Sequence, residues 1–168
     1  MIKVGILTIS DKGSRGERED LSGKVIEEIV KKINGEVKYY RIIPDEKEII
    51  QEELIKAVDS LHLDLILTTG GTGLGKRDVT PEATLAIIEK EVSGISEIIR
   101  IESFKKTNRA ILSRGMAGVR KESLIINLPG SPKGVRESLE IVLDALPHGI
   151  EVLKGQVTEC GRNYKEIR

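Results

Sequence analysis

The sequence predicts an α/β fold: a three-layer sandwich in which a mainly parallel central sheet carries helices on both faces. Segments rich in β-branched and aliphatic residues alternate along the chain with segments whose apolar residues follow helical spacing. One segment, Leu63–Thr69, is a nearly continuous apolar run, which is typical of a parallel strand covered on both sides. The length of 168 residues suits one domain. We expect residues 1–155 to form this domain and residues 156–168 to form a polar C-terminal tail.

The first elements follow from simple patterns. Ile2–Ile9 is β-branched and aliphatic, and it predicts a buried strand. The polar, glycine-containing segment Ser10–Glu19 predicts a loop. Apolar residues at helical spacing predict a helix over Asp20–Ile33. A second strand is expected over Glu36–Ile43, ended by Pro44, although its weak alternation leaves its burial undecided.

The middle of the chain continues the alternation. Glu46–Leu61 places its apolar residues on one helical face. The apolar run Leu63–Thr69 follows as the third strand. The next helix is expected to begin at Thr80-Pro81, because proline is favourable at the first helical position. A further helix is expected over Ser96–Lys106.

The last third contains one segment without a clear pattern, Arg109–Arg120. Ser123–Leu128 predicts the fourth strand. A helix is expected to follow Pro132 and to run to about Leu146. We expect Pro147 to interrupt it and Gly149–Leu153 to resume it.

Composition excludes several classes of protein. The 27 basic and 27 acidic residues give a net charge of zero, which argues against a protein that coats nucleic acid. Three Tyr, one Phe and no Trp leave little to stack on bases. No apolar run reaches the roughly 18–20 residues that span a bilayer. The only cysteine, Cys160, is compatible with a reducing compartment. We therefore expect a cytoplasmic protein with no nucleic-acid or membrane partner.

Four loops leave the predicted strands in the same direction, and each carries polar or glycine-rich sequence. In parallel sheets, ligands bind beyond the carboxyl ends of the strands. The loops begin at Ser10-Asp11, Pro44-Asp45, Gly70 and Pro129. Their convergence predicts a binding site at this edge of the sheet.

The glycine cluster Gly70–Gly75 fits neither familiar phosphate-binding motif. A P-loop would need Ser or Thr after Lys76, where this chain has Arg77, and the spacing GxGxG differs from the GxGxxG of dinucleotide-binding folds. Closely spaced glycines still allow backbone amides to approach an anion, and Thr69 and Thr72 add hydroxyl donors. The alternative is a tight strand-to-helix turn, although four glycines in six residues exceed what a turn needs.

Charged residues beside these loops suit a polyphosphate and a divalent cation. Lys76 and Arg77 supply cations, and Asp78 supplies a carboxylate that could bind Mg²⁺. The alternatives are a solvated, salt-bridged loop and a favourable helix start. For Asp45, local sequence favours a cap of the following helix over a catalytic role. Its expected place at the same edge as Asp78 makes the two interpretations more nearly equal.

The segment Asn127–Lys133 is a second candidate for anion binding. A strand ends, the chain turns and a helix begins, so that helix N-terminal amides, Ser131 and Lys133 could together hold a phosphate. A turn followed by an N-cap is the alternative. No Ser-His-Asp or Cys-His arrangement can be assembled from the strand-end loops, so the sequence does not support a nucleophilic hydrolase.

These motifs together resemble the Mog/MoaB-type molybdenum cofactor biosynthesis proteins, a family that also includes gephyrin-like domains. The central match is Thr68–Gly73 followed by Arg77–Thr84. Further matching segments fall in the expected order over roughly residues 2–155: Ile9–Asp11, Pro44–Glu46, Ala110–Arg114 and Ile126–Gly130.

The resemblance implies a three-layer α/β fold, a homotrimer and adenylyl transfer, in which molybdopterin and ATP yield adenylylated molybdopterin and pyrophosphate. It implies Mg²⁺ as cofactor, ATP as co-substrate and a downstream metal-insertion protein as partner. It points to Asp45 and Asp78 as the catalytic acidic pair and candidate Mg²⁺ ligands, which reverses the local preference for Asp45 as a cap. A non-catalytic molybdopterin-binding or assembly protein of the same family is the alternative.

The residues expected to bind molybdopterin and ATP come from the strand-end loops and the cations near them. They are Ser10, Asp11, Thr69, Gly70, Gly71, Thr72, Gly73, Lys76, Arg77, Arg114, Asn127, Pro129, Gly130, Ser131 and Lys133.

Overall fold

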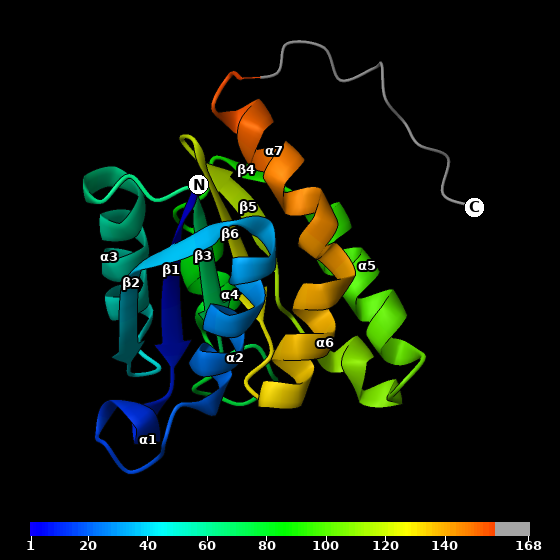
Figure 1. Ribbon diagram of the computed structural model, residues 1–168. Helices are drawn as coiled ribbons and strands as arrows, with labels where there is room; N and C mark the ends of the chain where they lie inside the picture. The colour runs from blue at the N-terminus through cyan, green and yellow to red at the C-terminus, as the bar shows by residue number, and fades with distance from the viewer. Residues whose placement is uncertain (157–168) are drawn as a thin grey trace.

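A six-stranded sheet with the order β2-β1-β3-β6-β5-β4 forms the centre of the computed structural model, which describes residues 1–156 (Figure 1). The strands are β1 (Ile2–Ile9), β2 (Gly35–Ile43), β3 (Leu65–Thr69), β4 (Lys90–Glu91), β5 (Ala117–Arg120) and β6 (Ser123–Leu128). Apart from Gln156, the expected tail lies outside the described residues, and so does Cys160.

Four strands of the sheet are parallel: β2, β1, β3 and β6. The other two lie at one edge, where β5 pairs antiparallel with β6 and β4 pairs antiparallel with β5. The predicted α/β fold with a mainly parallel sheet is therefore confirmed. The carboxyl ends of the four parallel strands meet at one edge, as the predicted site requires.

Helices cover both faces of the sheet (Figure 1). One core cluster joins the sheet to α2 (Leu21–Val30), α6 (Pro132–Val142) and α7 (Leu146–Leu153), with α5 (Ser93–Phe104) packed against it. A second cluster joins the opposite face to α3 (Lys47–Ile55) and α4 (Thr80–Leu85). The shorter elements are α1 (Asp11–Ser14), a π-helical turn at Lys56–Ser60 and 3₁₀ turns at Lys31–Ile33, Asn108–Leu112 and Leu143–Ala145.

The continuous apolar runs are explained by burial on both faces. Ile6 packs into the first cluster, and the next residue, Leu7, packs into the second. Leu67 and Ile66 repeat this arrangement on β3. All four side chains are fully buried, because successive side chains of a strand point to opposite faces and helices cover both.

The structure adds two short strands, β4 and β5, to the four that the sequence predicts, and it differs in three further local features. Residues 11–14, expected within a loop, form α1, because the Ser10 hydroxyl caps it by accepting a hydrogen bond from the Gly13 amide at 3.0 Å. Helix α5 begins at Ser93, three residues before the expected start. Pro147 does not interrupt a helix but lies in the first turn of α7, where its missing amide hydrogen costs nothing.

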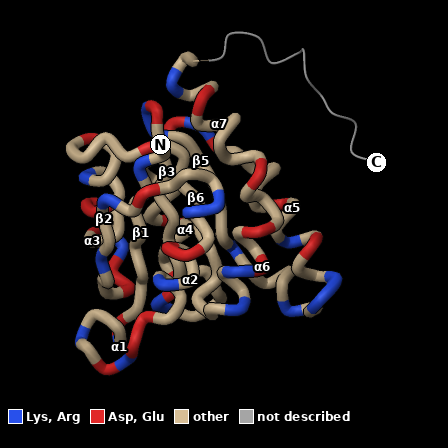
Figure 2. The backbone as a smooth tube through the Cα atoms, viewed as in Figure 1, with Lys and Arg blue, Asp and Glu red and all other residues tan. Residues whose placement is uncertain are grey.

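Positive and negative side chains are interspersed over the backbone (Figure 2). None of the described helices combines the length and the apolar character that a membrane-spanning helix needs.

Candidate functional site

The loops that follow β1, β2, β3 and β6 meet at one edge of the sheet and are tied to one another. The Thr69 hydroxyl donates to the Pro129 carbonyl at 2.7 Å, which joins the loops after β3 and β6. The Ser22 hydroxyl, at the start of α2, donates to the Gly130 carbonyl at 2.7 Å. The predicted convergence of strand-end loops is therefore present as a hydrogen-bonded unit.

The segment Gly70–Gly75 after β3, the glycine turn, needs glycine at two positions. Gly70 and Gly71 adopt positive φ values of 100° and 66°. A Cβ atom on Gly70 would lie 2.3 Å from the Ile9 carbonyl oxygen, and one on Gly71 would lie 2.3 Å from the Thr80 hydroxyl oxygen. The Thr80 hydroxyl also donates to the Gly70 carbonyl at 3.0 Å. The turn is thus closed against β1 and α4, which only residues without a side chain permit.

A first cavity of about 590 Å³ opens over these loops. Its walls include eight of the predicted site residues: Ser10, Asp45, Thr69, Gly70, Gly71, Asp78, Gly130 and Ser131. The predicted acidic pair therefore faces one shared space.

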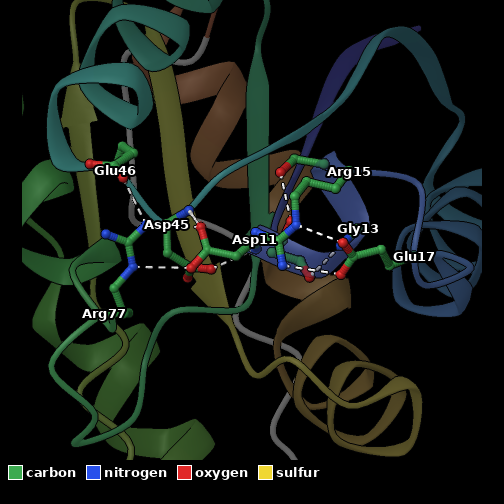
Figure 3. Close-up of polar contacts among 9 residues, drawn as sticks. Asp11, Gly13, Arg15, Glu17, Asp45, Glu46 and Arg77 are labelled. Carbon is green, nitrogen blue, oxygen red and sulfur yellow. Dashed lines mark hydrogen bonds and ion pairs between the residues drawn. The ribbon is translucent and has the colours of Figure 1, made fainter.

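Asp45 and Asp11 form a reciprocal pair (Figure 3). The Asp11 amide donates to Asp45 Oδ2 at 2.9 Å, and the Asp45 amide donates to Asp11 Oδ1 at 3.0 Å. Asp45 does not cap α3, because the N-cap residue is Glu46 and it makes no side-chain capping bond. The carboxylate of Asp45 thus bonds to a neighbouring loop and not to the helix that follows it.

Electrostatics distinguish the two members of this pair. Burial raises the pKa of the Asp45 carboxyl; the Asp11 amide opposes this shift, and the negative charges of Asp11 and Asp78 add to it. Hydrogen bonds from the Arg77 guanidinium lower the pKa of the Asp11 carboxyl. A cation bound beside Asp45 would therefore stabilise its ionised carboxylate, which burial and the neighbouring negative charges disfavour.

The glycine turn itself holds the side chain of Asp78. Its Oδ2 accepts a hydrogen bond from the Gly75 amide at 2.8 Å. A Cβ atom on Gly73 would lie 2.9 Å from the same oxygen, so this glycine leaves room for the carboxylate.

The donor set fits Mg²⁺ bound together with a phosphate substrate. Within residues 1–156 there is no group of three or more His, Cys, Asp or Glu residues that could hold a metal alone. Mg²⁺ commonly takes one or two carboxylates and completes its coordination with water and substrate phosphates. The carboxylates of Asp45 and Asp78, which line the first cavity, meet that requirement.

A second cavity of about 540 Å³ is lined by the later part of the glycine turn. Thr72, Gly73, Asn127 and Pro129, all predicted site residues, line it, and Ser131 lines both cavities. The Asn127 side chain is buried and donates at 3.0 Å to the hydroxyls of Thr68 and Thr84. The two cavities thus share a wall made by the loops after β3 and β6.

The remaining predicted residues lie outside both cavities: Asp11, Lys76, Arg77, Arg114 and Lys133. The arginines and Asp11 are engaged in hydrogen bonds, whereas the exposed ammonium groups of Lys76 and Lys133 make no ion pair among residues 1–156.

Sequence reasoning missed several polar residues of the cavity walls. Among them, Arg18, Asp20 and Ser22 line the first cavity, and Arg100 lines the second. Asp20 caps α2 by accepting from the Gly23 amide at 2.9 Å, a helix-start signal readable from the sequence. No local motif marks Arg18 or Arg100, because only the tertiary fold brings them to the cavities.

Comparison with known proteins agrees with this arrangement. A family model described as "Probable molybdopterin binding domain" matches residues 5–148. The chain is 47% identical over 99% of its length, and 95% of the relative's, to a protein of Helicobacter pylori named molybdopterin adenylyltransferase. It is 39% identical to the protein of that name from Escherichia coli, with 94% of this chain and 88% of the relative covered.

Solved structures show the same fold. The MoaB molybdopterin biosynthesis enzyme of Thermus thermophilus superposes with a TM-score of 0.88 at 52% identity, covering 92% of this chain and 98% of that one. A tungsten cofactor synthesizing MoaB protein of Pyrococcus furiosus gives a TM-score of 0.81 at 38% identity, covering 92% and 96%. The chain therefore belongs to the molybdenum cofactor biosynthesis family whose model is described as "Probable molybdopterin binding domain".

Proposed function

We propose that this protein is a molybdopterin adenylyltransferase that transfers AMP from ATP to molybdopterin and releases pyrophosphate. One structural observation carries the proposal. Two cavities share a wall at Ser131 and the glycine turn, and the first of them contains both Asp45 and Asp78. Two adjacent spaces suit a reaction that joins two large substrates. Sequence identity of 47% and 39% to proteins of that name, over nearly the whole chain, supports the same activity.

In the reaction, a terminal phosphate oxygen of molybdopterin attacks the α-phosphorus of ATP. A new phosphorus–oxygen bond forms, the bond to the β-phosphate oxygen breaks, and pyrophosphate leaves with that electron pair. The nucleophile is already anionic, so no general base is needed. The contribution of the protein is to align the two phosphates and to neutralise their charge.

We propose that Asp45 and Asp78 hold Mg²⁺ against the phosphate groups. The bound ion would supply charge neutralisation at the reacting phosphates. The two carboxylates orient it, and the backbone of the glycine turn offers amides to phosphate oxygens. Lys76, Lys133 and the cavity residue Arg18 are cations without an ion pair in the described part of the chain, so they are free to approach phosphate.

The substrate-binding residues that we propose are those predicted residues that line the two cavities. The first cavity contributes Ser10, Thr69, Gly70, Gly71, Gly130 and Ser131, and the second contributes Thr72, Gly73, Asn127 and Pro129. Within this proposal residues 1–155 form the active domain. A metal-insertion protein would accept the adenylylated product, and the reaction would take place in the cytoplasm.

We further propose that the chain assembles as a homotrimer. Helix α5 and the 3₁₀ turn at residues 108–112 expose an apolar cluster, consisting of Ile101, Phe104 and Ile111, which line one hollow of the surface. A cluster of this kind on one face is typical of a protein–protein contact.

The proposed activity is tested by pyrophosphate release. The purified chain with ATP, Mg²⁺ and molybdopterin should release pyrophosphate, and Asp78→Asn and Asp45→Asn should each lower kcat on the order of 10²-fold. Asp144→Asn is the matched control, because Asp144 lies in the 3₁₀ turn that follows α6, away from both cavities. Circular dichroism and thermal unfolding would establish that each variant is folded.

The alternative function, binding without transfer, makes a different prediction. A binding or assembly protein would retain molybdopterin tightly and release no pyrophosphate with ATP. Wild-type turnover in Asp78→Asn would contradict the role of that aspartate while leaving the family unchanged.

A further inference from the structure

We infer that Arg77 and Arg114 are positioning residues, each of which holds one of the two proposed catalytic aspartates in place, and that neither arginine is a ligand of the substrate phosphates. This inference rests on the proposed function, since it assigns roles within the same site. It departs from the expectation that both arginines bind substrate, and the contacts of their guanidinium groups carry it.

Arg77 clamps the two loops that hold Asp45 (Figure 3). Its Nε and Nη2 donate to the two carboxylate oxygens of Asp11 at 3.0 and 2.9 Å, and Nη2 also donates to Glu46 Oε1 at 2.7 Å. Asp11 and Asp45 are joined by their reciprocal amide–carboxylate bonds. Arg77 therefore fixes the Asp11 carboxylate, which accepts the hydrogen bond from the Asp45 amide. Its bond to Glu46 holds the residue next to Asp45.

Arg114 clamps the opposite side, where Asp78 lies. Its Nε donates to the Gly73 carbonyl at 2.7 Å, and its Nη2 donates to the Asp78 carbonyl at 2.6 Å. Its Nη1 donates to the carboxylate of Glu82, in the first turn of α4. Its own amide donates to the Thr72 carbonyl at 2.9 Å. One side chain thus joins the glycine turn, the backbone of Asp78 and helix α4.

These contacts engage the whole Arg114 guanidinium and one edge, Nε and Nη2, of the Arg77 guanidinium. All three nitrogen atoms of the Arg114 guanidinium donate to protein acceptors, two of which are backbone carbonyls. Arg77 forms a bidentate pair with Asp11, a geometry that gives strong and directional charge-assisted bonds. Neither arginine lines either cavity. A phosphate would have to compete with these bonds at Arg114. At Arg77 only Nη1 makes no hydrogen bond to residues 1–156, while the bonds of Nε and Nη2 direct the side chain to Asp11 and Glu46.

The arginines should therefore affect the rate of the chemical step and not the binding of ATP. Displacement of a reacting group by about 1 Å can lower a rate on the order of 10²-fold. Loss of a clamp should therefore lower kcat through the aspartate that it holds. The affinity for ATP should stay nearly constant, because binding would still rest on the glycine turn and the unpaired cations.

The test compares Arg77→Gln and Arg114→Gln by kcat and by equilibrium binding of a non-hydrolysable ATP analogue. We expect kcat to fall on the order of 10²-fold in each variant, with analogue affinity changed by less than about twofold. Affinity that falls about tenfold or more while kcat is kept would overturn the inference, because that is the behaviour of a phosphate ligand. Arg77→Lys keeps the charge without the bidentate fork and should recover only part of kcat.

Arg136→Gln is the matched control. Arg136 makes a bidentate pair with Glu28 at 3.3 and 2.9 Å, joining α6 to α2 outside both cavities. Loss of this arginine should leave kcat and analogue affinity unchanged. A second measurement uses Asp78→Asn as background, in which Arg114→Gln should cause no further loss of kcat. A further loss as large as that in the wild-type background would contradict action through Asp78.

Crystal structures of the two variants test the clamps without any turnover. The Asp45 carboxylate should move in Arg77→Gln, and the Asp78 carboxylate should move in Arg114→Gln, each by about 1 Å or more. Unmoved carboxylates would overturn the inference. A wild-type chain that releases no pyrophosphate would contradict the proposed transferase activity alone, since these positions can be measured in an inactive protein.

Discussion

Gly73 is the residue whose missing side chain matters most directly to the proposed chemistry. A Cβ atom there would lie 2.9 Å from Asp78 Oδ2, which is closer than real Cβ contacts allow, so Gly73→Ala must displace that carboxylate. We expect kcat for pyrophosphate release to fall by about tenfold or more, with thermal stability reduced only slightly.

Gly94→Ala is the control for this substitution, since nothing lies within 4 Å of a Cβ atom at that position in α5. Helix propensity favours alanine over glycine there, so this variant should keep its activity and unfold at the same or a slightly higher temperature. Unchanged kcat in Gly73→Ala would show that Asp78 does not need its present position.

Individual site residues could be predicted only where the order and direction of the strands alone decide their position. Asp45 and Asp78 follow parallel strands or the turn after one, so topology brings them to one edge. The contacts of Arg77 and Arg114 depend on how two loops fold over each other, and no local pattern encodes this. The same reason explains why Arg18 was missed.

An ion pair whose strength should vary with pH joins the π-helical turn after α3 to the end of β5. Arg120, at the end of β5, donates to Asp59 Oδ1 at 3.1 Å and Oδ2 at 2.7 Å, and Asp59 lies in the π-helical turn after α3. Hydrogen bonds from Arg120 lower the pKa of Asp59 to about 2. The folded-state pKa is below the unfolded value, so this stabilisation is present above about pH 4 and is lost as pH falls through about 2.

Asp59→Asn should therefore lower the free energy of unfolding by about 1 kcal/mol near neutral pH, a value reduced for the partial exposure of both side chains. The difference from wild type should shrink below about pH 4. Urea unfolding of both chains over this range measures it. A difference that stays constant down to about pH 2 would show that the pair does not titrate as argued.

Most strands were predictable in proportion to their burial; β5 is the exception, because it is mostly buried but spans only four residues, too few to show a pattern. The strands β1, β3 and β6 are covered on both faces and appear in the sequence as apolar runs, whereas β2 lies at the sheet edge and is only partly buried, which explains its weak pattern. The two-residue strand β4 is exposed and charged, so only its backbone pairing with β5 defines it. Side-chain patterns report burial, and an exposed edge strand offers none.

The whole molecule should associate through the apolar cluster on α5 and the following 3₁₀ turn. Ile101, Phe104 and Ile111 are exposed by 57%, 48% and 61% in the single chain. Burial of a large aliphatic or aromatic side chain contributes about 1.5–3 kcal/mol, so a few such residues in contact can hold subunits together. In the proposed trimer, Ile101→Glu would place a charge in that contact, and sedimentation equilibrium should find three-chain mass for wild type and one-chain mass for the variant.

The control must remove a comparable apolar surface elsewhere. Val152 on α7 is 38% exposed and lies outside the cluster, so Val152→Glu should retain the three-chain mass. If both variants keep the wild-type mass, the contact lies on another face. A wild-type chain that sediments as one chain would exclude the trimer itself. Arg100 lines both the second cavity and the hollow formed by Ile101, Phe104 and Ile111, so pyrophosphate release by a folded Ile101→Glu monomer measures whether assembly contributes to the site.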